Sequence, residues 1–373
     1  MSTFVRYRKL LWSWHKAMAA GWTDDDFVET VRSIDTSVAS VDGRGFLRTP
    51  ARWDDSLGGR GAPRRVFVKD ETHNVGGSHK ARHLMGLLLH LAVDATVNDT
   101  RLAISSCGNA AIGAATVARA AGRPIDVYIP TWADGSVVDV LTDLDATIHV
   151  CERRTGEVGD PCMLRFSEAV AQGSLAFGVQ ASENRWTLDG GRTLGWELAD
   201  QFGPEAPDHL FVQVGGGALL TSVGMGLLEA AVYGPLKRSP RVWAVQAEGC
   251  APFDRAWRGI APVGSIDVRL ADAGARATAL MVPWVDPESA ATGILDDVTY
   301  DWLGVSRALL ETGGDSVVVP EAEIGEANGV ATAAGYDADE TGTAGFAGLR
   351  MAINQGRVNE MDTAGVLITG IRR

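Results

Sequence analysis

The sequence predicts an α/β fold with mostly parallel sheets, arranged as two open lobes. From residue 66 onward, short apolar runs alternate with longer segments of helical periodicity, which is the pattern of βαβ units. Glycine is frequent, with 44 among 373 residues, and clusters at the ends of the apolar runs, where α/β proteins turn tightly from strand to helix. At roughly 150 residues per domain, the length favours two domains.

The first forty residues favour helices. Residues 7–20 are apolar and aromatic with interspersed basic residues, and Thr23 is expected to cap a second helix because three aspartates follow it. This arm carries no recognisable chemistry. Its tryptophans favour a docking or subunit contact over a site: Trp12, Trp14 and Trp22.

The rest of the chain alternates between strands and helices, which argues for parallel sheets. The expected strands cover residues 65–69, 102–105, 125–129, 146–150, 174–179, 209–214, 241–247 and 366–368. The expected helices cover residues 80–91, 110–121, 192–202 and 219–232.

Charge and composition disfavour several classes of protein. The net charge of −13 and the pI near 5.0 disfavour binding to nucleic acid or to an anionic membrane. No apolar stretch reaches the roughly 18 residues of a membrane span, and no signal peptide is expected. The four cysteines form no CxxC pair and no disulfide framework, so we expect a reduced, cytoplasmic protein without a metal site.

The first chemical motif spans residues 69–82 and reads KDETHNVGGSHKAR. Lys80 is expected in the first turn of a helix, where the positive end of the helix dipole disfavours the protonated amine. A neutral amine can form a Schiff base or abstract a proton. The alternative is a solvated surface lysine, which is the commoner use of this residue type.

A second motif, residues 105–110, lies between an expected strand and an expected helix. Backbone N–H groups at such a turn, together with Ser106 and Asn109, could bind a carboxylate or a phosphate. Ordinary helix capping is the alternative, because Ser and Asn are favoured at N-caps.

Two further turns end strands. The triplet Gly215, Gly216 and Gly217 could wrap a phosphate at the start of the following helix. It matches neither the GxGxxG fingerprint nor a P-loop, and a plain tight turn is its alternative. Near the C-terminus, Thr369 ends a strand with a hydroxyl group, which is a weak signal by itself.

An amine, a carboxylate seat and a phosphate cradle are together what a pyridoxal-phosphate enzyme needs. The chain resembles the fold type II pyridoxal-phosphate enzymes, the group of threonine synthase, threonine/serine dehydratase, cysteine synthase and the tryptophan synthase β chain. Residues 69–82 are similar to that family's K-D-E-x-x-x-x-x-G-S-x-K-x-R segment, residues 106–109 to its S-[ST]-G-N loop, and residues 215–217 to its phosphate loop. Segments 182–193 and 340–344 are closest to threonine synthases and dehydratases.

The resemblance implies a role for each motif. Lys80 would hold pyridoxal 5′-phosphate as a Schiff base and then act as the base at the substrate Cα, with Ser78 assisting. Asn109 would lie against the cofactor's 3′-oxygen, and Thr369 would hydrogen-bond its pyridine nitrogen. The phosphate would be held by the amides of Gly215, Gly216, Gly217, Ala218 and Leu219. The substrate carboxylate would be bound by Ser106, Cys107, Asn109 and Ala110.

The chain departs from the threonine synthase pattern at four positions. Ala81 follows the lysine where Asp is usual, and His79 replaces the commoner Phe. Cys107 replaces Ser or Thr, and Thr187 stands where Arg is frequent. These positions belong to the pocket, so the resemblance favours a related reaction over threonine synthesis from phosphohomoserine.

The resemblance also implies domains and a reaction class. We expect a helical arm at residues 1–45, a large cofactor-binding domain at 46–83 and 179–373, and a small mobile domain at 84–178. The small domain would carry the carboxylate loop and close over a small amino-acid substrate. We expect a homodimeric lyase that deprotonates Cα and eliminates a β-substituent. β-Replacement and the β,γ-replacement of threonine synthase are the alternatives within the family.

Three rival functions remain open at this point. His79 and His83 have the spacing of zinc ligands, but the HExxH pattern and a carboxylate ligand are missing. A nucleotide-binding domain built on the glycine triplet would leave Lys80 and Asn109 unexplained. A non-catalytic partner subunit with the same fold is disfavoured by the intact lysine and glycines.

Overall fold

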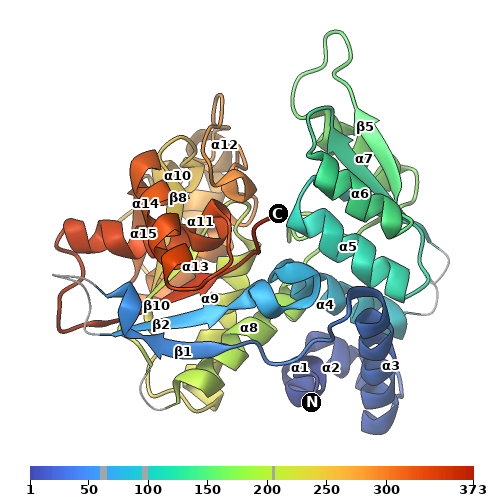
Figure 1. Ribbon diagram of the computed structural model, residues 1–373, viewed down its shortest axis with the longest axis horizontal. Coiled ribbons are helices and arrows are strands. Elements are labelled where there is room, and N and C mark those ends of the chain that lie inside the picture. Colours follow the sequence, from blue (N-terminus) through green and yellow to red (C-terminus); the bar gives the residue numbers. More distant parts are fainter. Residues whose placement is uncertain (59–64, 95–99, 204–205) are drawn as a thin grey trace. The chain divides into compact units, whose positions relative to one another are not determined.

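The computed structural model describes residues 1–58, 65–94, 100–203 and 206–373. The chain forms two compact units, each with its own sheet (Figure 1). Unit 1 contains residues 1–48 and 74–193, and unit 2 contains residues 49–73 and 194–373. Both sheets are mostly parallel, which confirms the predicted fold class.

Unit 2 is built on a six-stranded sheet with the order β1-β2-β10-β7-β8-β9. Every neighbouring pair is parallel except β1 with β2, which is antiparallel. Because β7 and β10 are parallel neighbours, their carboxyl ends lie at the same edge of the sheet. The strands are β1 Ala51–Asp54, β2 Arg65–Asp70, β7 His209–Gln213, β8 Arg241–Ala247, β9 Asp315–Val319 and β10 Thr363–Ile368.

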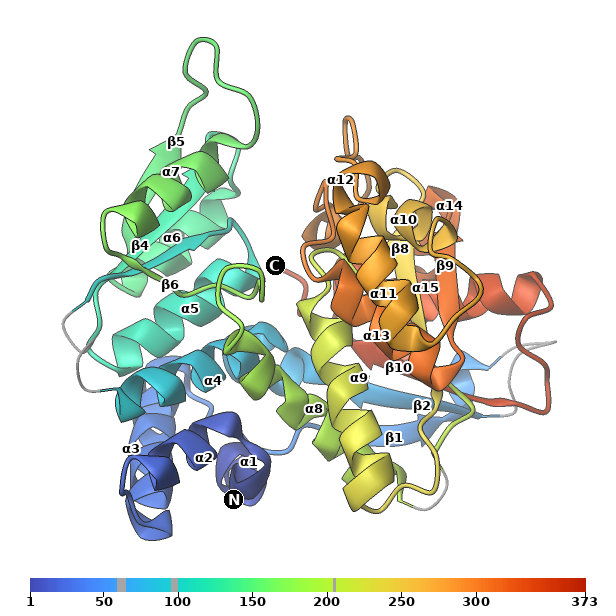
Figure 2. The same ribbon diagram turned by 180° about the vertical axis from the view of Figure 1, so that it is seen from behind.

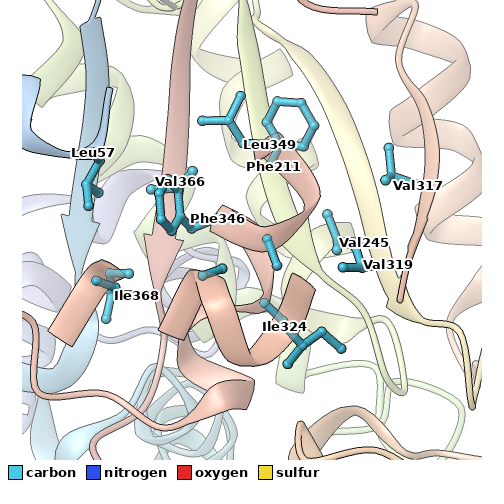
Figure 3. Packing of buried hydrophobic residues seen from close by; sticks show 14 of the residues in the cluster. Leu57, Phe211, Val245, Val317, Val319, Ile324, Phe346, Leu349, Val366 and Ile368 are labelled. Carbon is cyan, nitrogen blue, oxygen red and sulfur yellow. The ribbon is translucent and has the colours of Figure 1, made fainter. Parts of the chain in front are cut away.

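Helices cover both faces of this sheet. On one face, α14 (Glu321–Ala333) and α15 (Glu340–Asn354) bury a core against the strands, in which Phe346 and Leu349 meet Phe211 and Val366 (Figure 3). The other face buries a second core under helices that Figure 2 shows. These helices are α8 (Thr187–Phe202), α9 (Ala218–Tyr233), α10 (Pro252–Arg258), α11 (Ile266–Ala275) and α13 (Trp302–Thr312).

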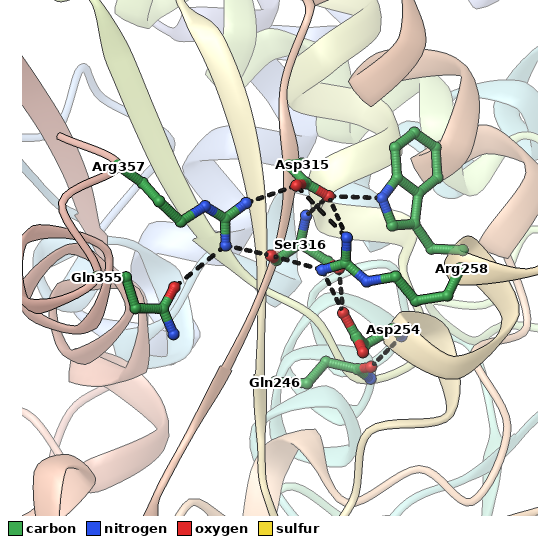
Figure 4. Close-up of polar contacts among 8 residues, drawn as sticks. Gln246, Asp254, Arg258, Asp315, Ser316, Gln355 and Arg357 are labelled. Carbon is green, nitrogen blue, oxygen red and sulfur yellow. Dashed lines mark hydrogen bonds and ion pairs between the residues drawn. The ribbon is translucent and has the colours of Figure 1, made fainter. Parts of the chain in front are cut away.

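A polar network fastens the edge strand β9 at its first residue. Asp315 accepts hydrogen bonds from Trp257 Nε1 at 2.6 Å, Arg357 Nη2 at 2.5 Å and Arg258 Nη1 at 3.2 Å (Figure 4). Arg258 extends from α10 (Pro252–Arg258), and Arg357 follows α15, so β9 is tied to segments before and after it in the chain. Such bonds give an edge strand partners that discourage pairing with another chain.

Unit 1 carries a four-stranded parallel sheet with the order β5-β4-β3-β6. One face packs against α7 through a small apolar cluster that includes Tyr128 and Phe166. The strands are β3 Leu102–Ser105, β4 Ile125–Pro130, β5 Thr147–Cys151 and β6 Leu175–Ala176. The helices are α4 Lys80–Val93, α5 Asn109–Ala120, α6 Gly135–Asp143 and α7 Pro161–Ala171.

The N-terminal arm is helical, but its first part is not one helix. Leu11 is extended (φ −76°, ψ 134°), so the predicted helix over residues 7–20 breaks into a short 3₁₀ turn and α2 (Trp12–Ala19). The predicted cap is confirmed. Thr23 begins α3 (Asp24–Asp42) with a capping box, in which its Oγ1 accepts from Asp26 N at 3.2 Å. A short helix, α1 (Thr3–Arg6), opens the chain.

The arm belongs to unit 1 because α8 holds it there. The buried carboxylate of Asp189 accepts from the backbone N–H groups of Trp12 and Ser13, both at 2.9 Å, and so caps α2 from 177 residues away. The same carboxylate contacts His90 and Arg192. The guanidinium of Arg192 lies 4.1 Å from the ring centre of Trp12, which gives this tryptophan a partner within the chain.

Helices α4 and α8 cross in close contact at two glycines, Gly86 and Gly190. A Cβ at Gly190 would overlap the carbonyl oxygen of Arg82 and lie 2.8 Å from Gly86 N. The two helix backbones therefore touch, and residues 74–83 and 179–193 pack with residues 84–178. The boundaries of compact packing thus differ from the predicted domains, and closure of a small domain stays a prediction.

Some strands have the bounds predicted from the sequence, and others differ from the prediction. The strands predicted at residues 102–105 and 241–247 are found with those bounds, whereas the one predicted at 174–179 is reduced to Leu175–Ala176. The antiparallel strand β1 and the edge strand β9 were not predicted. No helix in the described part of the chain is long and apolar enough to cross a membrane.

Candidate active site

Lys80 is the first residue of α4, as predicted. The preceding turn, Val75–Gly77, needs two glycines because Gly76 and Gly77 have φ of 64° and 66°. Between residues 74 and 91, Lys80 is the one residue that is not buried. Lys80 is thus a half-buried residue among buried ones, which differs from the solvated surface lysine of the alternative interpretation.

Ser78 lies beside this amine-bearing residue. Its side chain is 1% exposed, and its Oγ accepts from Lys80 N at 3.4 Å. The hydroxyl is therefore placed at the start of α4, within one helical turn of the lysine side chain.

The starts of α4 and α5 are packed closely. A Cβ at Gly113 would lie 3.4 Å from Ala81 N and 3.1 Å from Leu84 Cδ1, so only glycine fits between these helices without displacement. Ala81 is fully buried at this contact. The small residue at position 81 is thus explained by packing, since a larger acidic side chain would enter a buried helix crossing.

The loop of residues 106–109 joins β3 to α5 and is half-buried. The N-cap of α5 is Gly108, and no side chain caps this helix. Neither Ser106 nor Asn109 therefore occupies the N-cap position, and Ser106 Oγ accepts from Gly108 N at 3.5 Å. Burial raises the pKa of Cys107, so its thiol stays protonated and uncharged.

In unit 2, the glycine triplet forms the turn between β7 and α9. Gly217 is the N-cap of α9 with φ of 97°, and no side chain caps this helix either. A Cβ at Gly217 would lie 3.0 Å from both Thr299 Cγ2 and Val305 Cγ2. One at Gly215 would overlap the carboxylate oxygen Oδ2 of Asp296 and lie 2.9 Å from Ile294 Cα. The triplet is thus required by packing on one side, while its N–H groups begin a 16-residue helix.

Thr369 directly follows β10 and is 2% exposed. Its Oγ1 lies 2.7 Å from Gln213 Nε2, and its N–H donates to Gly342 O at 3.2 Å. Gly342 N donates in turn to Asp339, the N-cap of α15, at 2.6 Å. The hydroxyl is thus held in place from the neighbouring strand β7 and from the start of α15.

Two charged residues at the start of the first motif, Lys69 and Glu71, belong to a buried ion cluster that sequence reasoning missed. Lys69 Nζ contacts Glu197 Oε1 at 2.6 Å and Glu71 Oε1 at 3.9 Å, and all three side chains are 0% exposed. Thr49 Oγ1 donates to Glu71 at 2.5 Å, and Thr49 N donates to Glu197 at 2.8 Å. Charged residues directly after the apolar run of β2 were the available signal, because a lysine inside a buried strand needs a carboxylate partner.

The histidines do not form a metal site. His83 Nδ1 lies 3.0 Å from Thr187 O, and burial lowers the pKa of His83 to about 3, so the ring is neutral. His90 pairs with Asp189 at 3.0 Å. No group of three or more His, Cys, Asp or Glu side chains that could hold a metal ion is found within residues 1–58, 65–94, 100–203 and 206–373.

The chain is similar to known proteins over nearly its whole length. The family of pyridoxal-phosphate dependent enzymes matches residues 44–370. A threonine synthase of Methanosarcina acetivorans is 26% identical over 325 residues, which are 86% of this chain and 74% of that protein. A serine dehydratase-like protein of Mus musculus is 29% identical over 203 residues, or 54% and 57% of the two chains.

Solved structures share the fold. Threonine deaminase isoform 2 from Solanum lycopersicum is similar with a TM-score of 0.70 at 16% identity, covering 94% of this chain and 91% of that one. A maize serine racemase gives a TM-score of 0.67 at 19% identity, covering 92% and 93%. These likenesses confirm the predicted architecture.

Proposed function

Because the chain belongs to the family of pyridoxal-phosphate dependent enzymes, we propose that it is a lyase that eliminates the β-substituent of a small amino acid. The family match covers residues 44–370 and therefore includes each of the motifs from residue 69 to Thr369. Family membership favours an enzyme over a non-catalytic partner subunit. The similar proteins named above, a threonine synthase and a serine dehydratase-like protein, support chemistry at the β-carbon of small amino acids.

The residues of the chain fit pyridoxal phosphate. The N-terminus of α9 has no side-chain cap, and the triplet at residues 215–217 lets the backbone approach an anion where the helix dipole is positive. A half-buried lysine begins α4, as covalent attachment requires. We assign the phosphate to the amides of Gly215, Gly216, Gly217, Ala218 and Leu219.

The observation that carries the proposal is the placement of Lys80. Lys80 is the one residue among 74–91 that is not buried. It is the first residue of α4, where the positive end of the helix dipole disfavours a charged amine. We assign to Lys80 the covalent attachment of the cofactor and the removal of the proton from the substrate Cα. Ser78 Oγ, next to this residue, would help to pass that proton on.

The substrate carboxylate is assigned to the start of α5. This helix has no side-chain cap, so its first N–H groups and the loop side chains can receive an anion. Ser106 and the uncharged thiol of Cys107 present neutral groups to it. The assigned residues are Ser106, Cys107, Asn109 and Ala110, and Asn109 is also assigned to the 3′-oxygen of the cofactor.

The reaction follows from these assignments. Bound pyridoxal phosphate supplies the electron sink that stabilises negative charge at Cα. The loop at residues 106–109 orients the substrate so that its Cα proton faces the Lys80 amine. The Thr369 hydroxyl would face the ring nitrogen as a neutral group, which would keep the sink weak and favour loss of the β-substituent over a long-lived carbanion.

Replacement in place of elimination, including the β,γ-replacement of threonine synthase, is the second candidate function. The similarity to a threonine synthase over 86% of the chain favours it. Ala81 and Thr187 are fully buried and uncharged, so neither position can offer a charge to a phosphate-bearing side chain.

A substrate panel tests the proposal. Serine, threonine, phosphoserine, phosphohomoserine and hydroxyaspartate are incubated with the enzyme, and keto acid and ammonia are measured with and without a thiol acceptor. The proposal expects keto acid from at least one β-hydroxy amino acid without an acceptor. Product formation that always requires the acceptor would establish replacement instead.

Substitution of Lys80 gives the matching control. Lys80→Ala should lower turnover roughly a thousandfold or more, because it removes the base and the covalent attachment point. Lys237→Ala, at an exposed lysine of unit 2, should leave turnover unchanged. Equal activity of the two variants would contradict the assignment.

We further propose that the enzyme works as a cytoplasmic homodimer whose residues 84–178 close over the substrate. The mixed charge of the arm and its half-buried Trp22 support a role of residues 1–45 in subunit contact. Light scattering of the purified protein at two concentrations tests the dimer, and a monomer mass at both would contradict it.

A further inference from the structure

The amide nitrogen of Gln213 is surrounded by oxygen atoms. Gln213 ends β7 and is 3% exposed. Its Nε2 lies 2.7 Å from Thr369 Oγ1, 3.0 Å from Thr341 O, 3.1 Å from Gly342 O and 3.4 Å from Leu367 O. The amide therefore joins β7 to the end of β10 and to the first turn of α15.

These neighbours determine the orientation of the amide. Three of the four oxygens are main-chain carbonyls, which only accept hydrogen bonds. The NH₂ group of Gln213 must face them, because the side-chain oxygen in its place would meet three acceptors with no hydrogen between them. The contact with Thr369 consequently has one direction: the amide donates, and the hydroxyl oxygen accepts.

A hydroxyl that accepts from Gln213 turns its own hydrogen away from that amide. The N–H of Thr369, bonded to Gly342 O at 3.2 Å, fixes the backbone from which the hydroxyl extends. We infer that Gln213 is a positioning residue that holds the Thr369 hydroxyl as a donor toward the ring nitrogen of the cofactor. The inference rests on the proposed function, which assigns Thr369 to that nitrogen.

A donor at this place has a chemical consequence. A ring nitrogen that accepts a hydrogen bond must keep its lone pair, whereas a protonated nitrogen needs an acceptor. By fixing the direction of one hydroxyl, Gln213 therefore selects the unprotonated ring and limits the electron sink. The buried amide of Gln213 does not contact the substrate and acts on the protonation of the ring nitrogen through Thr369.

A double-substitution cycle tests this inference. Gln213→Met keeps the size of the side chain and removes the donor, so that the Thr369 hydroxyl loses its fixed direction. The absorption band of the bound cofactor is titrated with pH in four proteins: wild type, Gln213→Met, Thr369→Val and the double variant. We expect Gln213→Met to move the midpoint by about one pH unit, the size of one ordinary hydrogen bond.

The Thr369→Val background separates positioning from simple damage. Gln213→Met should add no further shift there, because the hydroxyl on which it acts is gone. Thr369→Ser should retain the wild-type band. Asn328→Leu removes another buried amide, which donates to Ala338 O at 3.0 Å and to Thr343 Oγ1 at 3.1 Å, and should destabilise the fold without moving the midpoint.

Several outcomes of these measurements would overturn the inference. Equal shifts in the threonine and valine backgrounds, or an equal shift from Asn328→Leu, would overturn the inference. If Gln213→Met does not fold, magnetic resonance of an isotope-labelled ring nitrogen in the wild-type enzyme replaces the cycle, and a protonated nitrogen would overturn the inference. A wild-type protein that binds no cofactor would instead refute the proposed function itself.

Discussion

The two units differ in the character of the groups to which roles are assigned. In unit 2, the glycine turn and Thr369 extend from neighbouring strands of a sheet with a hydrophobic core on each face, and Thr369 is 2% exposed. In unit 1, Lys80 and the loop at residues 106–109 begin helices and are half-buried. The groups of unit 2 are therefore suited to holding a cofactor in a fixed position, because they are mostly buried and Thr369 is held by two hydrogen bonds. The groups of unit 1 are suited to reacting, because they are half-buried and a substrate can reach them from water.

The largest effect is expected where unit 2 buries charge. Lys69→Met should lower the free energy of unfolding by about 3–5 kcal/mol, because it leaves the carboxylates of Glu71 and Glu197 buried without their cation. Urea unfolding measures the change, with Lys237→Met as the exposed control. A loss below about 1 kcal/mol would show that the cluster is hydrated and that unit 2 is less rigid than described.

Unit 1 should be most sensitive at its helix crossing. Gly190→Ala should cost about 3 kcal/mol, because the new methyl group would overlap the carbonyl oxygen of Arg82 in the helix that carries Lys80. Gly325→Ala, in the exposed interior of α14 with nothing within 4 Å, should instead stabilise by about 0.5–1 kcal/mol. Urea unfolding of both variants measures these changes. Equal changes in the free energy of unfolding for Gly190→Ala and Gly325→Ala would contradict the close contact between α4 and α8.

A pH-dependent difference is expected next, at the N-cap of α15. Burial raises the pKa of Asp339 to about 6. The folded carboxyl holds its proton more tightly than the unfolded one, so its stabilising contribution is complete below about pH 4 and is lost as the pH rises through about 6. Asp339→Asn keeps a capping oxygen but does not titrate.

The Asn variant should therefore gain stability relative to wild type between about pH 4 and pH 7, by up to about 3 kcal/mol. Thermal unfolding at a series of pH values measures the gain. A difference between the two proteins that is constant over this range would show that Asp339 titrates normally in the folded chain.

The smallest effect concerns the accessible loop of unit 1. Ser106→Ala should raise KM about tenfold, the size of one hydrogen bond to a charged carboxylate, and leave the unfolding temperature unchanged. Ser136→Ala, at an exposed serine bonded to Asp134, serves as the control in the same unit. A fall in unfolding temperature with unchanged KM would make Ser106 structural.

Local patterns predicted the strands and the turns that end them, because these depend on neighbours in the chain. The apolar run over residues 102–105 and the glycines at 215–217 need no distant partner to be recognised. The cap by Thr23 was likewise predicted locally, while its reciprocal bond with Asp26 is seen in the structure.

Contacts between distant segments could not be predicted in this way. Asp189 caps α2 across 177 residues, and Gly86 and Gly190 matter only because two helices cross there. The break of the arm at Leu11 is coupled to that distant cap, which selects Trp12 as the start of the helix. The sequence predicts Gln213 only as a strand residue. Its contact with Thr369 depends on the pairing of two strands that are far apart in the chain.

The most direct measurement is the site of covalent attachment. The enzyme is loaded with pyridoxal phosphate, reduced with borohydride, digested and mapped by mass spectrometry. The proposal predicts a single modified peptide that contains Lys80. Modification of another lysine, or of none while the protein remains folded and active on an amino acid, would contradict it.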